Sequence, residues 1–127
     1  YHDFLCVVVM SLICKRFEQG NQPYTASELS DAGEIPIRLT NQLLDELEEV
    51  GLIYGFSADA KSEIEHYLPA IDINQISVGR LLSTIESYGC EDFKIDHTKE
   101  FSSQWNAFIG HKQEAYLKSN AMLLKDL

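Results

Sequence analysis

Residues 25–53, TASELSDAGEIPIRLTNQLLDELEEVGLI, decide the fold. Thr25 followed three residues later by Glu28 is a capping box, which predicts the start of a short helix. The helix closes at Gly33, where the chain turns. Pro36 suits the first turn of a second helix because its fixed φ is helical and its missing N–H would be unpaired there. Two short helices joined by a tight turn predict a helix-turn-helix.

The second helix of this motif carries an apolar stripe. Its members recur at steps of three or four residues, as expected for one face of an α-helix: Ile37, Thr40, Leu43, Leu44 and Leu47. We expect this stripe to pack against the preceding helices and Gly51 to end the helix. The run FLCVVVMSLIC at residues 4–14 is about half the length that a bilayer crossing needs, so it predicts a buried core helix.

The rest of the chain predicts a wing and two further helices. Residues 52–57 and 63–68 read as antiparallel strands, with the pairing ended by Pro69. A helix follows within DINQISVGRLLSTIESYG, with Asp72 or Asn74 as its N-cap. Four of its apolar residues should face inward: Ile76, Leu81, Leu82 and Ile85. A long last helix should begin at Thr98 and continue through Leu123 and Leu124.

The predicted fold class is mainly α with a small β-hairpin, a winged helix-turn-helix plus two C-terminal helices. The 127 residues fit one domain, 1–127, with a winged-helix core at 1–70 and a C-terminal helical extension at 71–127. We expect the chain, which opens on Tyr1, to be a fragment of something longer.

Charge argues against nucleic acid as a partner. The formal net charge is −10, and the stretch from Glu34 to Val50 has a single cation, Arg38, against five carboxylates. A DNA-reading helix ordinarily presents Lys and Arg to phosphates. Acidic residues therefore favour a protein partner or self-association, and we expect Asp45, Glu48 and Glu49 to form part of that surface.

Cysteine and histidine spacing predicts no catalytic, cofactor or metal site. Cys6 and Cys14 lie eight residues apart on one predicted helix, which is about 12 Å and too far for a disulfide. We expect them to be buried thiols. The four histidines show no HxH, HxxE or HExxH spacing. The protein is therefore expected not to be an enzyme.

The segment ASELSDAGEIPIRLTNQLLDELEEVGLI resembles the motif of Rrf2-type and MarR-type bacterial regulators. That resemblance implies that the second helix of the motif enters the DNA major groove. The groove-facing positions would lie near Ile35, Ile37, Arg38, Thr40, Asn41 and Gln42. Arg38 can read guanine and Asn41 or Gln42 adenine, with Thr40 beside them. The alternative is an ordinary polar outer face. Rrf2-type cluster ligation needs a close set of cysteines after the motif, and this chain has Cys90 alone there.

A second resemblance covers roughly residues 36–109. The stretches RLTNQLLDELEEVGLI, YLPAIDINQISVGRLLSTIESYG and FKID look like the cytoplasmic C-terminal extension of some YihY/BrkB-type inner-membrane proteins, a family labelled ribonuclease BN-like. It implies the tail of a longer membrane protein on the cytoplasmic side of the bacterial inner membrane. The membrane would be reached only through an N-terminal region outside this chain. The residues do not support ribonuclease activity.

The leading prediction is thus a non-catalytic interaction or regulatory domain of the YihY/BrkB-like tail type. Besides the acidic residues, its predicted interaction surface includes apolar residues near the C-terminus: Tyr116, Leu117, Leu123 and Leu124. The alternative is a cytoplasmic Rrf2/MarR-like DNA-binding transcription regulator acting as a dimer.

Overall fold

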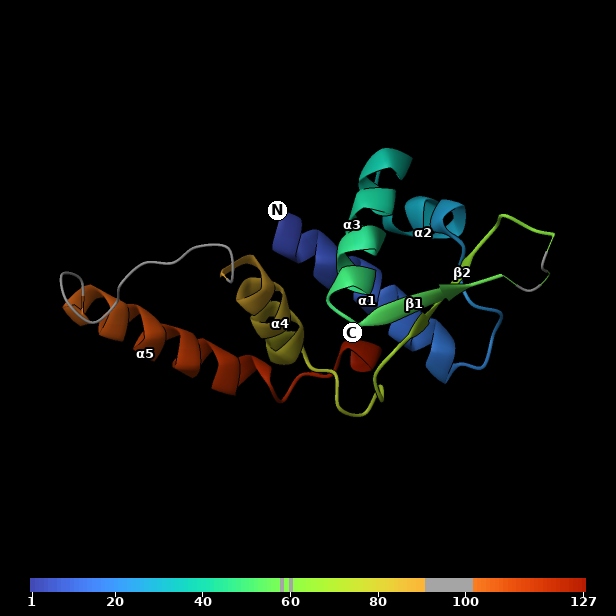
Figure 1. The fold of residues 1–127 in the computed structure, drawn as a ribbon. Helices are drawn as coiled ribbons and strands as arrows, with labels where there is room; N and C mark the ends of the chain where they lie inside the picture. The colour runs from blue at the N-terminus through green and yellow to red at the C-terminus, as the bar shows by residue number, and fades with distance from the viewer. Residues whose placement is uncertain (58, 60, 91–101) are drawn as a thin grey trace.

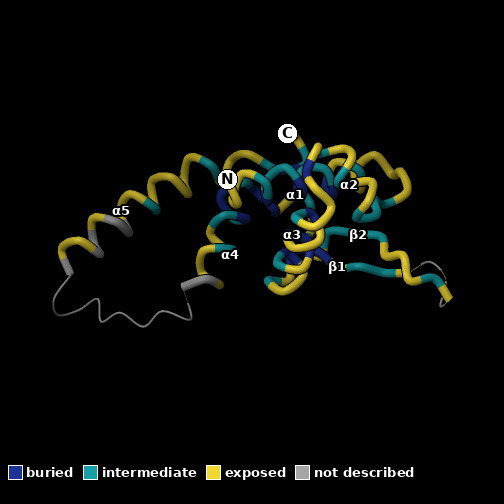
Figure 2. Tube along the Cα trace, turned by 90° about the horizontal axis from the view of Figure 1, so that it is seen from above, coloured by how far each residue is buried: buried dark blue, intermediate teal, exposed yellow. Residues whose placement is uncertain are grey.

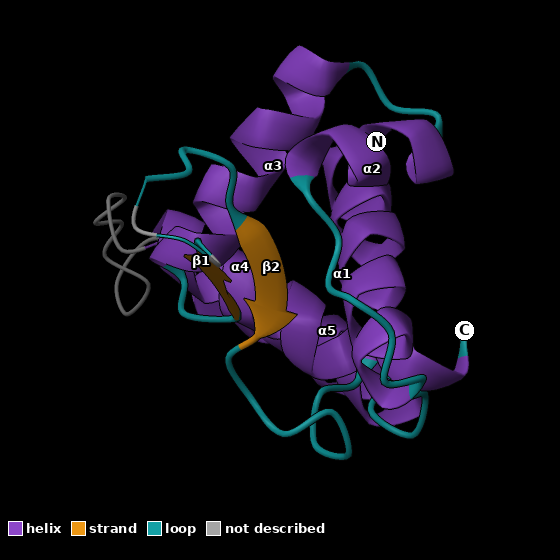
Figure 3. Cartoon of the chain, turned by 90° about the vertical axis from the view of Figure 1, so that its right-hand side faces the viewer, coloured by secondary structure: helices purple, strands orange, loops and turns teal. Residues whose placement is uncertain are grey.

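The computed structural model describes residues 1–57, 59, 61–90 and 102–127. Its elements run in this order (Figure 1): α1 (His2–Glu18), α2 (Ala26–Gly33), α3 (Ile37–Glu49), β1 (Ile53–Phe56), β2 (His66–Pro69), α4 (Val78–Cys90), α5 (Ser102–Ser119) and the 3-10 helix η1 (Leu124–Asp126). The two strands form an antiparallel sheet, drawn in orange in Figure 3. The fold is therefore mainly α with a small hairpin, a winged helix-turn-helix followed by two further helices, as the sequence predicts.

α1 lies at the centre of the molecule. Its apolar residues recur at helical spacing, and one face of it is fully buried: Cys6, Val9, Met10, Ile13 and Cys14. α2, α3, β2, α4 and η1 all contact this helix. Figure 2 shows the buried segments gathered around α1 and α3, whereas α5 is largely exposed along its length. The apolar run near the N-terminus is thus a core helix, as predicted.

The helix-turn-helix begins with the predicted capping box. The backbone N–H of Glu28 donates to the Thr25 hydroxyl over 3.2 Å, and the N–H of Thr25 donates to the Glu28 carboxylate over 3.0 Å. α2 remains helical through Gly33, and the left-handed residue that closes it is Glu34, at φ 54°. Gly33 allows close packing, because a Cβ there would lie 3.1 Å from Cδ1 of Ile35.

The apolar stripe of α3 is confirmed except at its first member. Thr40, Leu43, Leu44 and Leu47 are buried, but Ile37 is 48% exposed. Ile35, in the turn before α3, belongs to the hydrophobic core instead, so the core position at this end of the stripe is already filled. Gly51 ends the helix as predicted, with φ +80°.

The wing is shorter than predicted. Its register pairs Ile53 with Pro69 and Phe56 with His66. Pro69 therefore lies in the last pair rather than beyond it, and the pairing is extended by the N–H of Ala70, which donates to the carbonyl of Leu52 over 2.9 Å. Proline is tolerated at a strand end because no ladder donor is required of it there.

Ser77 caps α4, so the predicted cap at Asp72 or Asn74 is wrong. The Ser77 hydroxyl accepts from the N–H of Arg80 over 3.0 Å and donates to Oδ1 of Asn120 over 2.9 Å. Asp72 instead accepts from the N–H of Asn74 over 2.9 Å in a turn before the helix. Residues 72–77 form that turn and lead into α4, which moves the helix start to Val78.

The C-terminal segment turns back onto the core, so a helix continuing to Leu124 is also wrong. α5 ends at Ser119, and the N–H of Leu124 donates to the carbonyl of Ile76 over 3.2 Å. Leu124 is fully buried, in η1, which packs on α1. Burial of this leucine side chain stabilises the fold by about 1.5–3 kcal/mol, which favours the return of the C-terminal segment to the core. The predicted helix start at Thr98 lies outside the described residues.

Replacing Ser77 by alanine tests this connection. Ser77→Ala removes the α4 cap and the hydrogen bond to Asn120, so the free energy of unfolding should fall by about 1–2 kcal/mol. Urea denaturation followed by circular dichroism measures it. The control is Ser83→Ala, an exposed serine of the same helix, which should change stability by less than about 0.5 kcal/mol. Equal losses in both variants would contradict the assignment.

Candidate functional site

The outer face of α3 is an exposed surface of the helix-turn-helix. Arg38, Asn41, Gln42 and Asp45 recur at spacings of three and four residues, and all four are exposed. Ile37 lies beside them at the N-terminal end. A guanidinium, two carboxamides and an exposed aliphatic side chain thus share one helix end, where they offer donors, acceptors and an apolar contact to a ligand.

Two residues of the predicted groove-facing set do not reach this surface. Thr40 is fully buried, and its hydroxyl donates to the carbonyl of Pro36 over 3.1 Å. Its prediction as a nucleic-acid contact is therefore wrong, because the side chain faces the core and its hydroxyl is hydrogen-bonded to a backbone carbonyl at the start of α3. Ile35 is 4% exposed and is removed from the set for the same reason.

The backbone N–H groups in the first turn of α3 are not capped by a side chain of the described residues. Pro36 is the N-cap, and no described side chain accepts a hydrogen bond from the first turn. That turn also contains no acidic residue. Unpaired N–H groups together with the positive end of the helix dipole favour an anion at such a terminus.

The carboxylates of α3 are distributed around the helix rather than gathered on the Arg38 face. Glu46 contacts His2 of α1, and Glu49 accepts a hydrogen bond from the hydroxyl of Tyr88 in α4. Glu48 accepts one from the backbone N–H of Gly55 in β1. Asp45 and Glu49 lie on the Arg38 face, at spacings of seven and eleven residues, and both are exposed. The charge counted along the sequence therefore overstates the charge on this face.

Carboxylates do converge between α3 and the wing. A Cβ on Gly55 would lie 2.6 Å from Oε2 of Glu65 and 3.0 Å from Oε1 of Glu48, so both side chains cover this glycine. Burial raises the pKa of Glu48, and the nearby carboxylates of Glu65 and Asp45 raise it further. Burial and the same acidic neighbours raise the pKa of Tyr67 to about 12. This end of α3 is strongly acidic.

Neutralising Glu48 should relieve that repulsion. Since the folded-state pKa of Glu48 is raised, the folded protein holds this proton more tightly, and the carboxylate opposes folding as pH rises. Glu48→Gln should therefore be neutral to stabilising at pH 7. Because the side chain is exposed, the gain should stay below about 0.5 kcal/mol.

The gain should vanish at acid pH, where Glu48 is protonated in the wild type. Urea denaturation across the acid range measures it. Glu63→Gln, an exposed wing residue, is the control and should be unaffected. A loss of stability at pH 7 in Glu48→Gln would contradict the repulsion.

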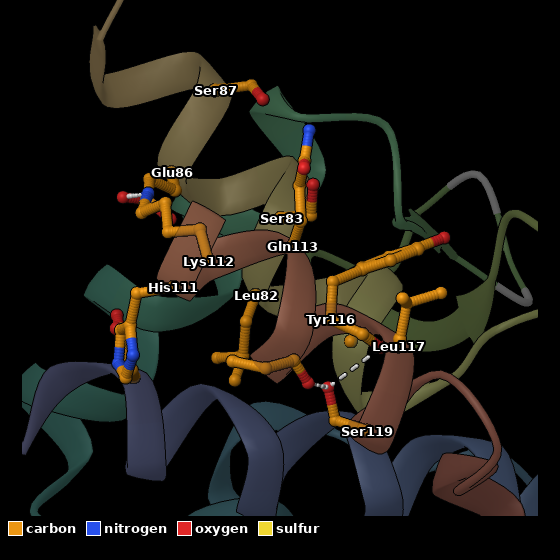
Figure 4. A pocket seen from close by; sticks show the side chains of 13 residues that line it. Leu82, Ser83, Glu86, Ser87, His111, Lys112, Gln113, Tyr116, Leu117 and Ser119 are labelled. Carbon is orange, nitrogen blue, oxygen red and sulfur yellow. Dashed lines mark hydrogen bonds and ion pairs between the residues drawn. The ribbon is translucent and has the colours of Figure 1, made fainter. Parts of the chain in front are cut away.

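A pocket of about 790 Å³ lies between α4 and α5. Figure 4 shows Leu82, Ser83 and Glu86 of α4 facing residues of α5, with Glu86 paired to Lys112. Such a volume is typical of small-molecule sites. Tyr116 and Leu117, two of the residues predicted to form an interface, line it.

The other two apolar residues of the predicted interface lie differently. Leu124 is fully buried against α1, and its prediction as an interface residue is wrong. Leu123 is half-buried and pairs with Ser77 in an isolated bridge. The return of the C-terminal segment accounts for both positions, because it turns these leucines from α5 towards the core.

Sequence spacing missed one cluster. His2 and Cys6 lie one helical turn apart in α1, and their side chains meet Glu46 of α3, with the three ligand atoms within 4.8 Å of one another. The i, i+4 pair was visible in the sequence, but its distance from Glu46 along the chain concealed the third member. Cys6 and Cys14 are buried free thiols as predicted, and burial raises the pKa of each to about 12.

No protein-family model and no curated protein sequence matches the chain. Among the described residues, no helix combines the length and apolar character that a membrane crossing requires. Several solved structures resemble it in fold. IscR of T. potens superposes with a TM-score of 0.71 at 18% identity, covering 99% of this chain and 82% of IscR.

Two structures of CymR resemble this chain to a similar degree. CymR of B. subtilis, described as its global cysteine regulator, has a TM-score of 0.68 at 13% identity, over 99% of this chain and 92% of that one. Oxidized CymR of Staphylococcus aureus has a TM-score of 0.66 at 16% identity, covering 98% of this chain and 90% of that one. These likenesses establish a winged-helix fold that includes α4 and α5.

Proposed function

We propose that this chain is a DNA-binding transcription regulator that reads the major groove with the N-terminal half of α3. The observation that carries the proposal is the exposed set Ile37, Arg38, Asn41 and Gln42 at that end of the helix. In helix-turn-helix proteins, the N-terminal residues of the second helix contact base edges. Arginine pairs with guanine, asparagine or glutamine with adenine, and an aliphatic side chain packs on the thymine methyl.

The fold likeness supports a regulator over the tail of a membrane protein. It spans 98–99% of the chain in each of these comparisons, so it takes in the two C-terminal helices that a helix-turn-helix motif alone leaves out. CymR of B. subtilis is a regulator, and no finding supports the YihY/BrkB-like reading. A regulator of this kind is not an enzyme and acts in the cytoplasm.

Electrostatics limit how α3 can approach DNA. Arg38 and the free amides of the first turn lie at one end, and the acidic group of Asp45, Glu48 and Glu65 lies at the other. We therefore infer an approach in which the helix enters the groove by its N-terminal tip. Lys61, exposed in the wing, can add a second phosphate contact. Two such contacts give a slope of about −2 per protomer in log affinity against log salt.

Arg38→Ala tests base reading. Duplexes selected by the wild-type protein from a random-sequence pool, then titrated by fluorescence anisotropy, should bind this variant at least about fivefold more weakly, because a bidentate base contact is worth about 1–3 kcal/mol. Lys118→Ala removes the same charge from the exposed face of α5 and is the matched control, expected to bind normally. Equal losses of DNA affinity in the two variants would indicate a general charge effect.

Failure to enrich any sequence at low salt would contradict the DNA proposal. That outcome would favour a second function, binding of a basic protein partner. The observation behind it is the convergence of Glu48 and Glu65 over Gly55 in a chain of net charge −10. The same acidic surface that weakens DNA contact would attract a cationic one.

We further propose that the regulator self-associates through α5. This helix extends away from the rest of the fold in Figure 1, and it exposes Tyr116 and Leu117, the latter by 71%. Exposed apolar residues beside a pocket are typical of association surfaces. A two-fold dimer would present two copies of α3 to the two halves of a palindromic site.

Leu117→Asp should weaken this self-association. A charge placed at an apolar contact must be desolvated, so the dimer dissociation constant should rise at least about tenfold in sedimentation equilibrium. The control, Ile64→Asp, changes an exposed isoleucine of the wing and should leave the dissociation constant unchanged. A wild-type protein that stays monomeric at high concentration would contradict the dimer.

A further inference from the structure

We propose that His2, Cys6 and Glu46 form a zinc site that ties α1 to α3. The three potential ligand atoms, an imidazole nitrogen, a thiol sulfur and a carboxylate oxygen, lie within 4.8 Å of one another. Zinc combines such nitrogen, sulfur and oxygen donors in tetrahedral sites. The cluster lies away from the Arg38 face, and the proposal does not depend on DNA binding.

The spacing of the donors fits one small cation. Zinc bonds of about 2.0–2.3 Å place neighbouring ligand atoms about 3.3–3.6 Å apart in a tetrahedron. Nε2 of His2 lies 3.9 Å from Sγ of Cys6, close to this separation. Glu46 touches the same nitrogen directly, so its carboxylate must move outward slightly. Its side chain is 40% exposed and has room to do so.

The surroundings supply the remaining features of a metal site. Nδ1 of His2 lies 3.2 Å from Oδ1 of Asp3, which is the carboxylate–histidine arrangement that orients an imidazole toward a metal. The His2 side chain is 46% exposed, so solvent reaches the cluster and can provide a fourth ligand. Cys6 forms the buried floor of the site.

Charge balance also favours a divalent cation. Cys6 gives up its thiol proton to solvent as the zinc–sulfur bond forms, so one S–H bond is exchanged for one Zn–S bond. The thiolate and the Glu46 carboxylate then neutralise the two positive charges of the ion. Asp3 adds a further negative charge next to the imidazole. Without a cation, two carboxylates lie beside a single imidazole.

Cys14 is the natural comparison within the same helix. It is buried and free like Cys6, eight residues further along α1. No cluster of histidine, cysteine and carboxylate groups forms around it in the part of the chain that the structure describes. Metal binding that requires Cys6 but not Cys14 would therefore show a specific site rather than binding to any free thiol.

The site would link the core helix to the helix that carries Arg38. Glu46 lies in the C-terminal half of α3, and His2 and Cys6 lie in the first turns of α1. An ion bound between them would add to the packing that positions α3 on α1 and make that contact more rigid. If α3 reads DNA as proposed above, zinc would then regulate that reading, and this consequence alone rests on the proposed function.

Cobalt(II) titration of the full chain, purified without a histidine tag, tests the site. Tetrahedral cobalt bound to a thiolate absorbs in the near ultraviolet and visible, and zinc should displace it at one ion per chain. The wild type and Cys14→Ser should show these bands. Cys6→Ser should lose the thiolate band, and His2→Gln and Glu46→Gln should bind at least about tenfold more weakly.

Thermal unfolding gives a second readout and guards against a folding defect in Cys6→Ser. His2 is largely at the surface, so His2→Gln should fold normally by circular dichroism. Zinc should raise the Tm of the wild type and Cys14→Ser but not that of His2→Gln. Absence of a cobalt spectrum in the folded wild type, or equal bands in Cys6→Ser and the wild type, would overturn the zinc site. Neither result would bear on DNA binding.

Discussion

Burial of one face of α1 is the interaction on which the other elements depend. Leu43, Leu44 and Leu47 of α3 belong to the same core, as does Leu124 from the far end of the chain. Each fully buried leucine contributes about 1.5–3 kcal/mol, whereas an exposed ion pair contributes about 0–1 kcal/mol. Packing therefore sets the position of α3, and contacts such as that of His2 with Glu46 only adjust it. The face opposite the leucines is left exposed.

Local features of the fold could be predicted from the sequence because the sequence spacing contains them. Thr25 and Glu28 cap α2 within one helical turn, and Gly51 ends α3 by its own backbone freedom. The start of α4 and the return of the C-terminal segment could not be predicted, because they depend on residues distant in sequence. Ser77 becomes the cap through its bond to Asn120, and the buried position of Leu124 requires a core built by α1.

The candidate site was predictable in composition but not in arrangement. Arg38, Asn41 and Gln42 are polar residues of an amphipathic helix, and their exposure follows from periodicity. Periodicity also places Thr40 in the buried stripe, and only the resemblance to regulators placed it among the contacts to DNA. The net charge of this face is harder still to predict, because a count along the chain treats all carboxylates alike. Glu46 and Glu49 in fact contact α1 and α4, and those contacts exist only once the helices have assembled.

If α3 reads DNA as proposed, distance along the helix determines how far its acidic end opposes that binding. Asp45 lies seven residues from Arg38, about 10 Å along the axis, which exceeds the Debye length of about 8 Å at physiological salt. A phosphate held at the helix tip is therefore largely screened from Asp45, and more so from Glu48. Because that repulsion is already largely screened, added salt acts mainly on the phosphate contacts, as the expected slope in log affinity assumes. In the proposed complex, the acidic surface would then slow encounter with DNA more than it weakens the bound contact.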